Sequence, residues 1–107
     1  MIVELEVQEG LQAAWADRIR RQIDFKLASL TAHVRMVRVR LSVTPDKTGN
    51  DVYRCTMQAT LAGSVVEEAI TTGPLPNICV ADAAARLART IARAYKLSDR
   101  ALRQQSA

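Results

Sequence analysis

The spacing of apolar residues alternates between a period of two and a period of three to four along this chain, and this alternation constrains the fold more than any other feature. Near the N-terminus, Val3, Leu5 and Val7 alternate with Glu4 and Glu6. A period of two is typical of a strand with one face buried and the other in water. The first segment is therefore predicted to be a strand.

The next segment has the spacing of a helix. After Gly10, apolar residues recur every three or four positions, and charged residues take the other sides. This pattern predicts an amphipathic helix from Leu11 to about Thr31. Its apolar stripe consists of Leu11, Trp15, Ile19, Ile23, Leu27 and Leu30.

Three further strands are predicted after this helix. The period returns to two from Val34 to Thr44, and again from Tyr53 to Leu61 after a cluster of turn-forming residues at 45–51. These two segments are predicted to pair as a hairpin. The run from Val65 to Thr72 is rich in β-branched residues and alternates less clearly, as an edge strand often does.

A second helix is predicted at the end of the chain. Gly73, Pro74 and Pro76 end the sheet, because proline lacks the backbone donor that a strand ladder needs. Asn77 is expected to cap a helix that runs from about Ile78 to Leu97 or on past Ser98. The predicted order of elements is therefore β-α-β-β-β-α.

Two amphipathic helices and a sheet with one apolar face can bury one another if both helices lie on that face. We expect an α+β fold in which a mixed or antiparallel-rich four-stranded sheet carries both helices on one face. A length of 107 residues suits one core, so we expect a single domain, with a short flexible tail from about residue 99. The predicted core includes Trp15, Ile19, Ile23, Val39, Leu41, Met57, Leu87 and Ile91.

The sequence favours the cytoplasm and gives no indication of a membrane partner. No apolar stretch approaches the ~20 residues that cross a bilayer, and the acidic N-terminal segment does not resemble a signal peptide. Cys55 and Cys79 form no CxxC pair and are too few for a disulfide scaffold. Both are therefore expected to be reduced thiols that serve as small apolar residues.

Basic side chains are concentrated near the C-terminus. The chain has 15 Lys and Arg against 11 Asp and Glu, for a formal net charge of +4. In the last predicted helix, charged positions advance by 4, 3, 4, 3 and 4, which places them on one face. They are Asp82, Arg86, Arg89, Arg93, Lys96 and Arg100. Such an uncompensated row predicts an anionic partner such as RNA, and the alternative is a solvated face that only keeps the protein soluble.

The sequence contains no arrangement that is typical of catalysis. His33 is the single histidine, and neither a nucleophile motif, a phosphate-binding loop nor clustered metal ligands are present. The chain is therefore predicted not to be an enzyme and to need no cofactor, metal or small-molecule substrate. Trp15 and Phe25 are expected in the core, which leaves Tyr95 as the plausible base-stacking residue, so sequence-specific binding of single strands is not expected.

The final helix resembles the last helix of a known family. The order of elements, the strand Val34 to Thr44 and the segment VADAAARLARTIARAYK resemble the short form of the ribosome hibernation-promoting and ribosome-associated inhibitor family, also called the sigma-54 modulation or S30AE family. There the last helix has an apolar pair, Asp, then Lys-Leu-x-Arg-Gln-Leu and a basic end. The matching positions here are Asp82, Arg86, Leu87, Arg89, Ile91 and Arg93.

The resemblance implies a fold similar to double-stranded-RNA-binding domains. It also implies a role in the stress response, in which the protein occupies the small-subunit channel where tRNA and mRNA would bind. Basic side chains would then contact phosphates of 16S rRNA.

The leading hypothesis is a ribosome-associated translation inhibitor or hibernation factor that acts by steric occupancy, as a monomer in the free state. The expected primary contacts are Arg86, Arg89, Arg93 and Lys96, and the expected secondary contacts are Arg38, Arg40 and Arg54 on the far face of the sheet. The rival hypothesis is a regulatory protein-interaction domain of the same fold, which meets an acidic protein surface and does not bind the ribosome.

Overall fold

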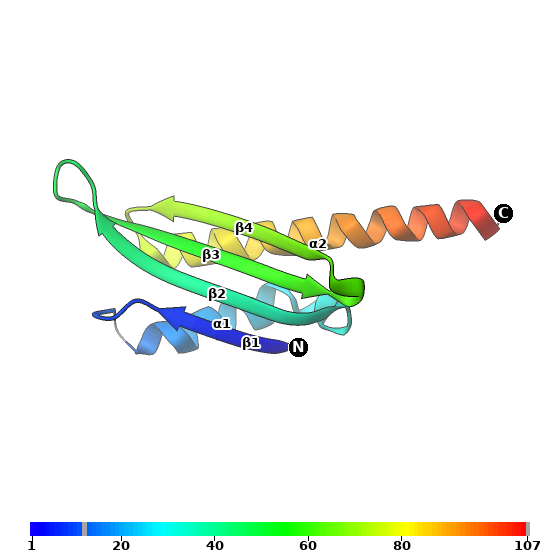
Figure 1. The fold of residues 1–107 in the computed structure, drawn as a ribbon, viewed down its shortest axis with the longest axis horizontal. Coiled ribbons are helices and arrows are strands. Elements are labelled where there is room, and N and C mark those ends of the chain that lie inside the picture. Colours follow the sequence, from blue (N-terminus) through cyan, green and yellow to red (C-terminus); the bar gives the residue numbers. More distant parts are fainter. Residues whose placement is uncertain (12, 107) are drawn as a thin grey trace.

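The computed structural model describes residues 1–11 and 13–106, and for residues 96–106 it describes the backbone alone. The helices and strands follow the predicted order β-α-β-β-β-α, with short 3-10 segments after α1 and β3 (Figure 1). The elements are β1 (Ile2–Val7), α1 (Ala14–Lys26), η1 (Ala28–His33), β2 (Val34–Pro45), β3 (Asp51–Leu61), η2 (Ala62–Ser64), β4 (Val66–Gly73) and α2 (Pro76–Ser106). The strand boundaries agree with the prediction to within about two residues.

The strands form one mixed sheet in the order β1-β2-β3-β4. β1 runs parallel to β2, and the remaining neighbours are antiparallel. One row across the four strands, on the face toward the core, consists of Leu5, Val39, Met57 and Ala69. The adjacent row, on the opposite face, consists of Glu4, Arg38, Gln58 and Glu68. The register therefore separates an apolar face from a polar one.

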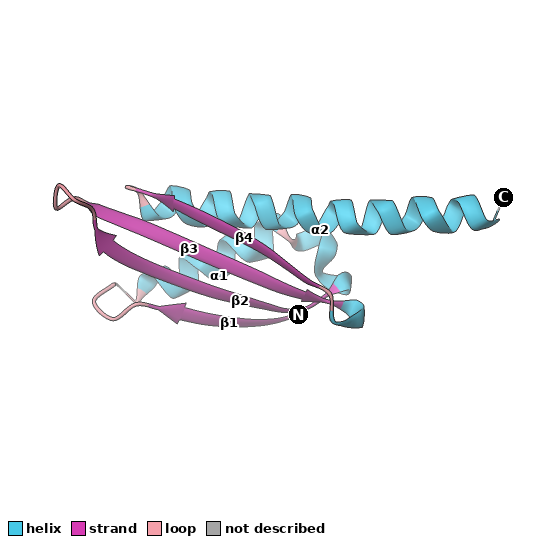
Figure 2. Cartoon of the chain, turned by 45° about the horizontal axis from the view of Figure 1, so that its top comes forward, coloured by secondary structure: helices cyan, strands magenta, loops and turns pink. Residues whose placement is uncertain are grey.

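Both helices lie on the same face of the sheet, as predicted (Figure 2). α2 packs against β3 and β4, and α1 packs against α2 and β1. Of the residues predicted to lie in the core, all but Phe25 are buried, and Cys55 and Cys79 are buried free thiols. The face of the sheet that carries no helix is called the open face below.

The first helix is shorter than predicted. The expected range was Leu11 to about Thr31, but α1 covers Ala14–Lys26 and is followed by the 3-10 segment η1. The tighter turn is visible in the Leu30 N–H, which donates to the Leu27 carbonyl three residues earlier at 2.9 Å. The periodicity of apolar residues continues through such a segment, so it did not reveal where the α-helix ends.

The prediction that Phe25 belongs to the core is wrong. Its side chain is 76% exposed, whereas Ile23 and Leu27 on either side are fully buried. Successive residues of an α-helix are turned by about 100°, so a residue two positions from both members of a buried stripe points away from it. Phe25 therefore lies on the outer surface of α1.

The second helix begins earlier than predicted. It starts at Pro76 rather than Ile78, so Asn77 lies inside the first turn and is not the cap that the sequence suggested. Proline is well suited to a first turn because its missing N–H has no partner there. The helix continues to Ser106. The flexible tail expected from about residue 99 falls where only the backbone is described, and it stays a prediction.

Candidate nucleic-acid interface

The predicted row of cations lies along one side of α2. The interior of this helix is rich in Ala, the strongest helix former, and its apolar side is buried through Val80, Leu87 and Ile91. Arg86, Arg89 and Arg93 are all exposed, and we call these three residues the basic stripe. The predicted fourth cation, Lys96, lies outside the residues whose side chains are described.

The basic stripe borders the outer strand of the sheet. A hollow between α2 and β4 is lined by Arg86, Arg89, Thr90 and Arg93 from the helix and by Glu68, Ala69 and Ile70 from the strand. The Arg86 Nη1 donates to the Ile70 carbonyl at 3.5 Å, and the Thr90 hydroxyl donates to the Arg86 carbonyl at 2.9 Å. The stripe and the edge of β4 therefore form one continuous surface.

The charge of the basic stripe is not neutralised within the described residues. The structure shows no ion pair between a carboxylate and any of the three guanidinium groups. Glu68 lines the same hollow and accepts a hydrogen bond from the Gln58 Nε2 at its Oε2, at 2.6 Å; its single negative charge leaves the three cations in excess. Three unpaired like charges on neighbouring helical turns repel one another, so an external polyanion would be bound favourably.

Two contacts hold α2 in place on either side of the stripe. Near the start of the helix, the buried Thr71 hydroxyl of β4 donates to the Cys79 carbonyl at 2.7 Å. Beyond the stripe, the Tyr95 hydroxyl donates to the His33 carbonyl at 3.0 Å, and the two rings lie with centroids 4.1 Å apart. Because α2 is held in place, less conformational entropy is lost when the stripe binds a partner.

The same contact changes the interpretation of Tyr95. The sequence indicated it as the plausible base-stacking aromatic, but its ring already faces the His33 imidazole and its hydroxyl is occupied. The half-buried Tyr95 thus helps to hold α2 against η1. His33 accompanies it at the end of η1, and the sequence gave no sign of this pairing across 62 residues.

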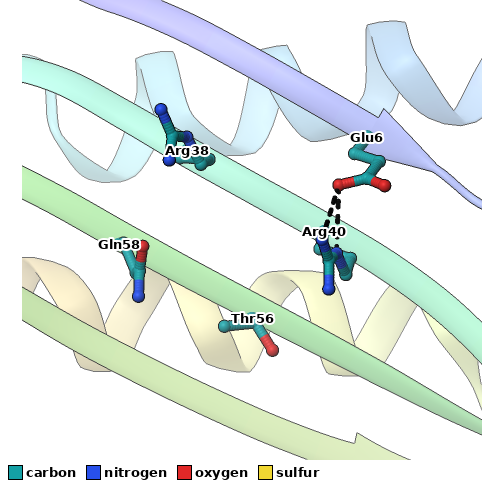
Figure 3. A pocket seen from close by; sticks show the side chains of 5 residues that line it. All are labelled: Glu6, Arg38, Arg40, Thr56 and Gln58. Atoms are coloured by element: carbon teal, nitrogen blue, oxygen red, sulfur yellow. Dashed lines mark hydrogen bonds and ion pairs between the residues drawn. The ribbon is translucent and has the colours of Figure 1, made fainter.

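The secondary arginines lie on the open face, on β2 and β3, and not on the helix layer that carries the basic stripe. Arg38 and Arg40 project from β2 into a hollow that Glu6, Thr56 and Gln58 complete (Figure 3). Arg38 Nε is 3.1 Å from Glu4 Oε2, and Arg40 contacts Glu6 Oε2 through both Nε and Nη2 at 3.0 Å. The parallel register of β1 and β2 places each glutamate beside its arginine.

These ion pairs leave the open face close to neutral. Arg54 also lies on this face, on β3, where its cross-strand neighbours are Ser42 and Thr72. Across the face as a whole, the number of arginines equals the number of glutamates. The arginines are Arg38, Arg40 and Arg54, and the glutamates are Glu4, Glu6 and Glu68. The structure thus brings Arg86, Arg89 and Arg93 together on one surface and places Arg38, Arg40 and Arg54 on a second, charge-balanced surface.

Two further kinds of feature are absent from the described residues. No group of three or more His, Cys, Asp or Glu side chains in that part of the chain is arranged to hold a metal ion. Within the same part, no helix is both long and apolar enough to span a membrane.

Comparison with known proteins gave matches in structure but not in sequence. No protein-family model matches the chain, and no curated protein matches it. A ribosomal subunit interface protein from Coxiella burnetii is similar in structure, with a TM-score of 0.73 and 11% identity over 91% of this chain and 99% of that one. The N-terminal domain of Protein Y from Thermus thermophilus has a TM-score of 0.68 and 17% identity, covering 87% of this chain and 98% of that one.

At these identities the likeness concerns the fold. The four-stranded mixed sheet with two helices on one face is the fold of both proteins, and each is covered almost completely. The resemblance between the present sequence and the S30AE family, which was based chiefly on the last helix, therefore extends to the three-dimensional arrangement of the whole domain.

Proposed function

We propose that this chain is a ribosome-associated translation inhibitor or hibernation factor that binds rRNA of the small subunit through the basic stripe of α2. The observation that carries the proposal is the row of Arg86, Arg89 and Arg93, which are exposed, aligned and without a carboxylate partner among the described residues. The likeness in fold to a ribosomal subunit interface protein supports the choice of the ribosome as partner.

The chemistry of the stripe suits an RNA backbone. A guanidinium group is planar and always charged, and its donors match the oxygens of a phosphate. A-form RNA exposes phosphates and 2′-hydroxyls more readily than bases, so a rigid row of cations recognises it by shape and charge. Inhibition then needs only occupancy of the space where tRNA and mRNA bind, in the cytoplasm, by a monomer without a cofactor or a covalent step.

Lys96 extends the stripe by one helical turn in this proposal, and the open face provides secondary contacts. Arg54 is the open-face cation without an ion pair among the described residues, whereas Arg38 and Arg40 are held by Glu4 and Glu6. The contribution of the paired arginines to RNA binding is therefore expected to be smaller than that of the basic stripe.

The test compares two variants with the same loss of charge. In the stripe variant, R86A/R89A/R93A, binding to purified small subunits should weaken steeply. The slope of log affinity against log salt should flatten by about 0.7 to 0.9 for each lost contact, because fewer counterions are released. In the matched control, R20A/R35A/K47A, three other exposed cations are removed and the slope should stay near that of the parent.

Folding is not expected to confound this comparison. The three stripe side chains are exposed, and Ala is a better helix former than Arg, so the free energy of unfolding should stay the same or rise slightly. A folded stripe variant that binds subunits as tightly as the parent, with the same salt slope, would contradict the proposal. Function would then have to be sought on the open face around Arg38, Arg40 and Arg54.

A further inference from the structure

Phe25 is the most exposed large apolar side chain among the described residues, and the proposed function does not use it. Its exposed fraction is 76%, against 60% for Ile2, the next in order. A single exposed apolar residue is common on protein surfaces and by itself indicates nothing. The surroundings of Phe25, however, distinguish it from an isolated surface residue.

One cation lies over the ring of Phe25, and two more follow the same side of α1. Arg21 and Arg18 lie four and seven residues before it in α1, a spacing that places all three on one side of the helix. The Lys26 Nζ lies 5.4 Å from the centroid of the Phe25 ring. The Arg18 Cζ lies 5.0 Å from the centroid of the Trp15 ring, and no described carboxylate forms an ion pair with these cations. We call Arg18, Arg21 and Phe25 the α1 platform.

The platform and the basic stripe belong to the same layer of the molecule. α1 and α2 cover one face of the sheet and pack against each other (Figure 2). The stripe borders β4, whereas α1 packs against α2 and β1, so an RNA that contacts both surfaces passes over α2. The open face, with its paired charges, is on the other side of the sheet.

We propose that the α1 platform binds an unpaired nucleobase of RNA, which stacks on the ring of Phe25 while Arg18 and Arg21 contact the adjoining phosphates. The inference rests on the proposed function and extends it, because the basic stripe recognises only a backbone. Base stacking on an aromatic side chain tolerates every base, since each has a π face. The platform thus adds a preference for RNA with an unpaired residue at this position.

The size and charge of the platform favour RNA over a protein partner. A stable protein interface buries about 800 Å² on each side around an apolar centre, and one phenyl ring among cations does not provide that area. A nucleobase needs one ring only, and its phosphates complement the guanidinium groups. Flanking cations around an exposed aromatic are the arrangement expected for a single-stranded nucleic acid.

Three substitutions of Phe25 separate stacking from other roles. Phe25→Ala removes the ring, Phe25→Leu keeps apolar volume without a π face, and Phe25→Trp keeps a larger ring. Binding is measured to small subunits, to a short single-stranded RNA of mixed sequence and to a fully paired RNA duplex. Because Phe25 is exposed, thermal unfolding of all three variants should match the parent.

The Ala and Leu variants should bind small subunits and the single-stranded RNA about 5- to 100-fold more weakly, the Trp variant should bind like the parent, and duplex binding should not change. The salt slope should also stay constant, because no charge is lost. A Leu variant that binds like the parent would overturn the inference in favour of an apolar protein contact. An Ala variant that binds single-stranded RNA and subunits normally would overturn it altogether.

The stripe variant R86A/R89A/R93A distinguishes this failure from failure of the proposed function. If the stripe variant loses small subunits while Phe25→Ala does not, the platform inference fails and the proposed function stands. If the stripe variant keeps its subunit affinity and salt slope, the proposed function fails, whatever Phe25 does with single-stranded RNA.

Discussion

Thr71 is the one polar side chain that is buried among those described, at 7% exposure, and its hydroxyl joins β4 to α2. Replacing it with valine keeps the shape and removes the donor to the Cys79 carbonyl. The free energy of unfolding should fall by about 0.5 to 1.5 kcal/mol, the usual net contribution of such a bond. Urea denaturation measures this change.

The neighbouring threonine is a matched control for that experiment. Thr72 lies on the same strand but is exposed on the open face, so Thr72→Val makes the same chemical change in water. Its effect should stay within about 0.5 kcal/mol. Equal effects of the two substitutions would show that the Thr71 hydroxyl does not fix α2.

The Cys55 thiol should make the free energy of unfolding depend on pH in the alkaline range. Burial raises the pKa of its thiol from the ordinary value of 9.0 to about 12, and the Cys79 thiol adds to the rise. The folded protein therefore keeps this proton when the unfolded chain has lost it, and the contribution to stability is complete below about pH 9. The free energy of unfolding should fall as the pH rises from there toward 12.

Urea midpoints across this pH range measure the effect. Tyr and Lys side chains also titrate there, so the parent is compared with Cys55→Val, which keeps an apolar side chain at this buried position and has no thiol. The variant should lose less stability with rising pH. Identical pH dependence in both proteins would mean that the Cys55 thiol ionises as easily when folded as when unfolded.

At the scale of elements, the ion pairs between β1 and β2 control how many cations the open face offers. Glu4→Gln together with Glu6→Gln would release Arg38 and Arg40 from their partners. Affinity for RNA should rise and its salt slope should become steeper, because more cations can displace counterions. The measurement is a salt titration of binding to the paired duplex.

The control for this pair removes two acids elsewhere. Asp24→Asn with Asp51→Asn gives the same change in net charge, on α1 and at the start of β3. It should change the salt slope less than the glutamate pair does. If both pairs of substitutions act alike, the net charge of the protein matters and the local pairing does not.

The elements were largely predictable from the spacing of apolar residues, and their contacts were not. Periods of two and of three to four located the strands and helices because side-chain direction repeats with those periods. The partners of Arg38 and Arg40 depend on the parallel register of two strands 34 residues apart, which a single sequence does not reveal. The misplacement of Phe25 had a different cause, since its distance of two residues from Ile23 and from Leu27 already indicated an outward position.

At the scale of the whole molecule, the distribution of charge differs from one face to the other. The open face is balanced, while the helix layer and the edge of β4 carry Arg18, Arg21 and the basic stripe without ion pairs in the described residues. The formal net charge of the chain is +4. Its concentration on one side gives the molecule a preferred orientation toward a polyanion.

The position of the basic stripe beside β4 also bears on self-association. A strand at the border of a sheet presents unpaired backbone groups to which another chain can add a strand, and proteins commonly block this with charged side chains. Here the Arg86 guanidinium donates a hydrogen bond to the Ile70 carbonyl, so that this acceptor is not free for another strand. If two copies met at this border, their basic stripes would also repel each other. The stripe variant should therefore form dimers or larger species as its concentration rises, which analytical ultracentrifugation detects, whereas R20A/R35A/K47A should stay monomeric. The arginines proposed to bind RNA would then also keep the protein from aggregating when no RNA is bound.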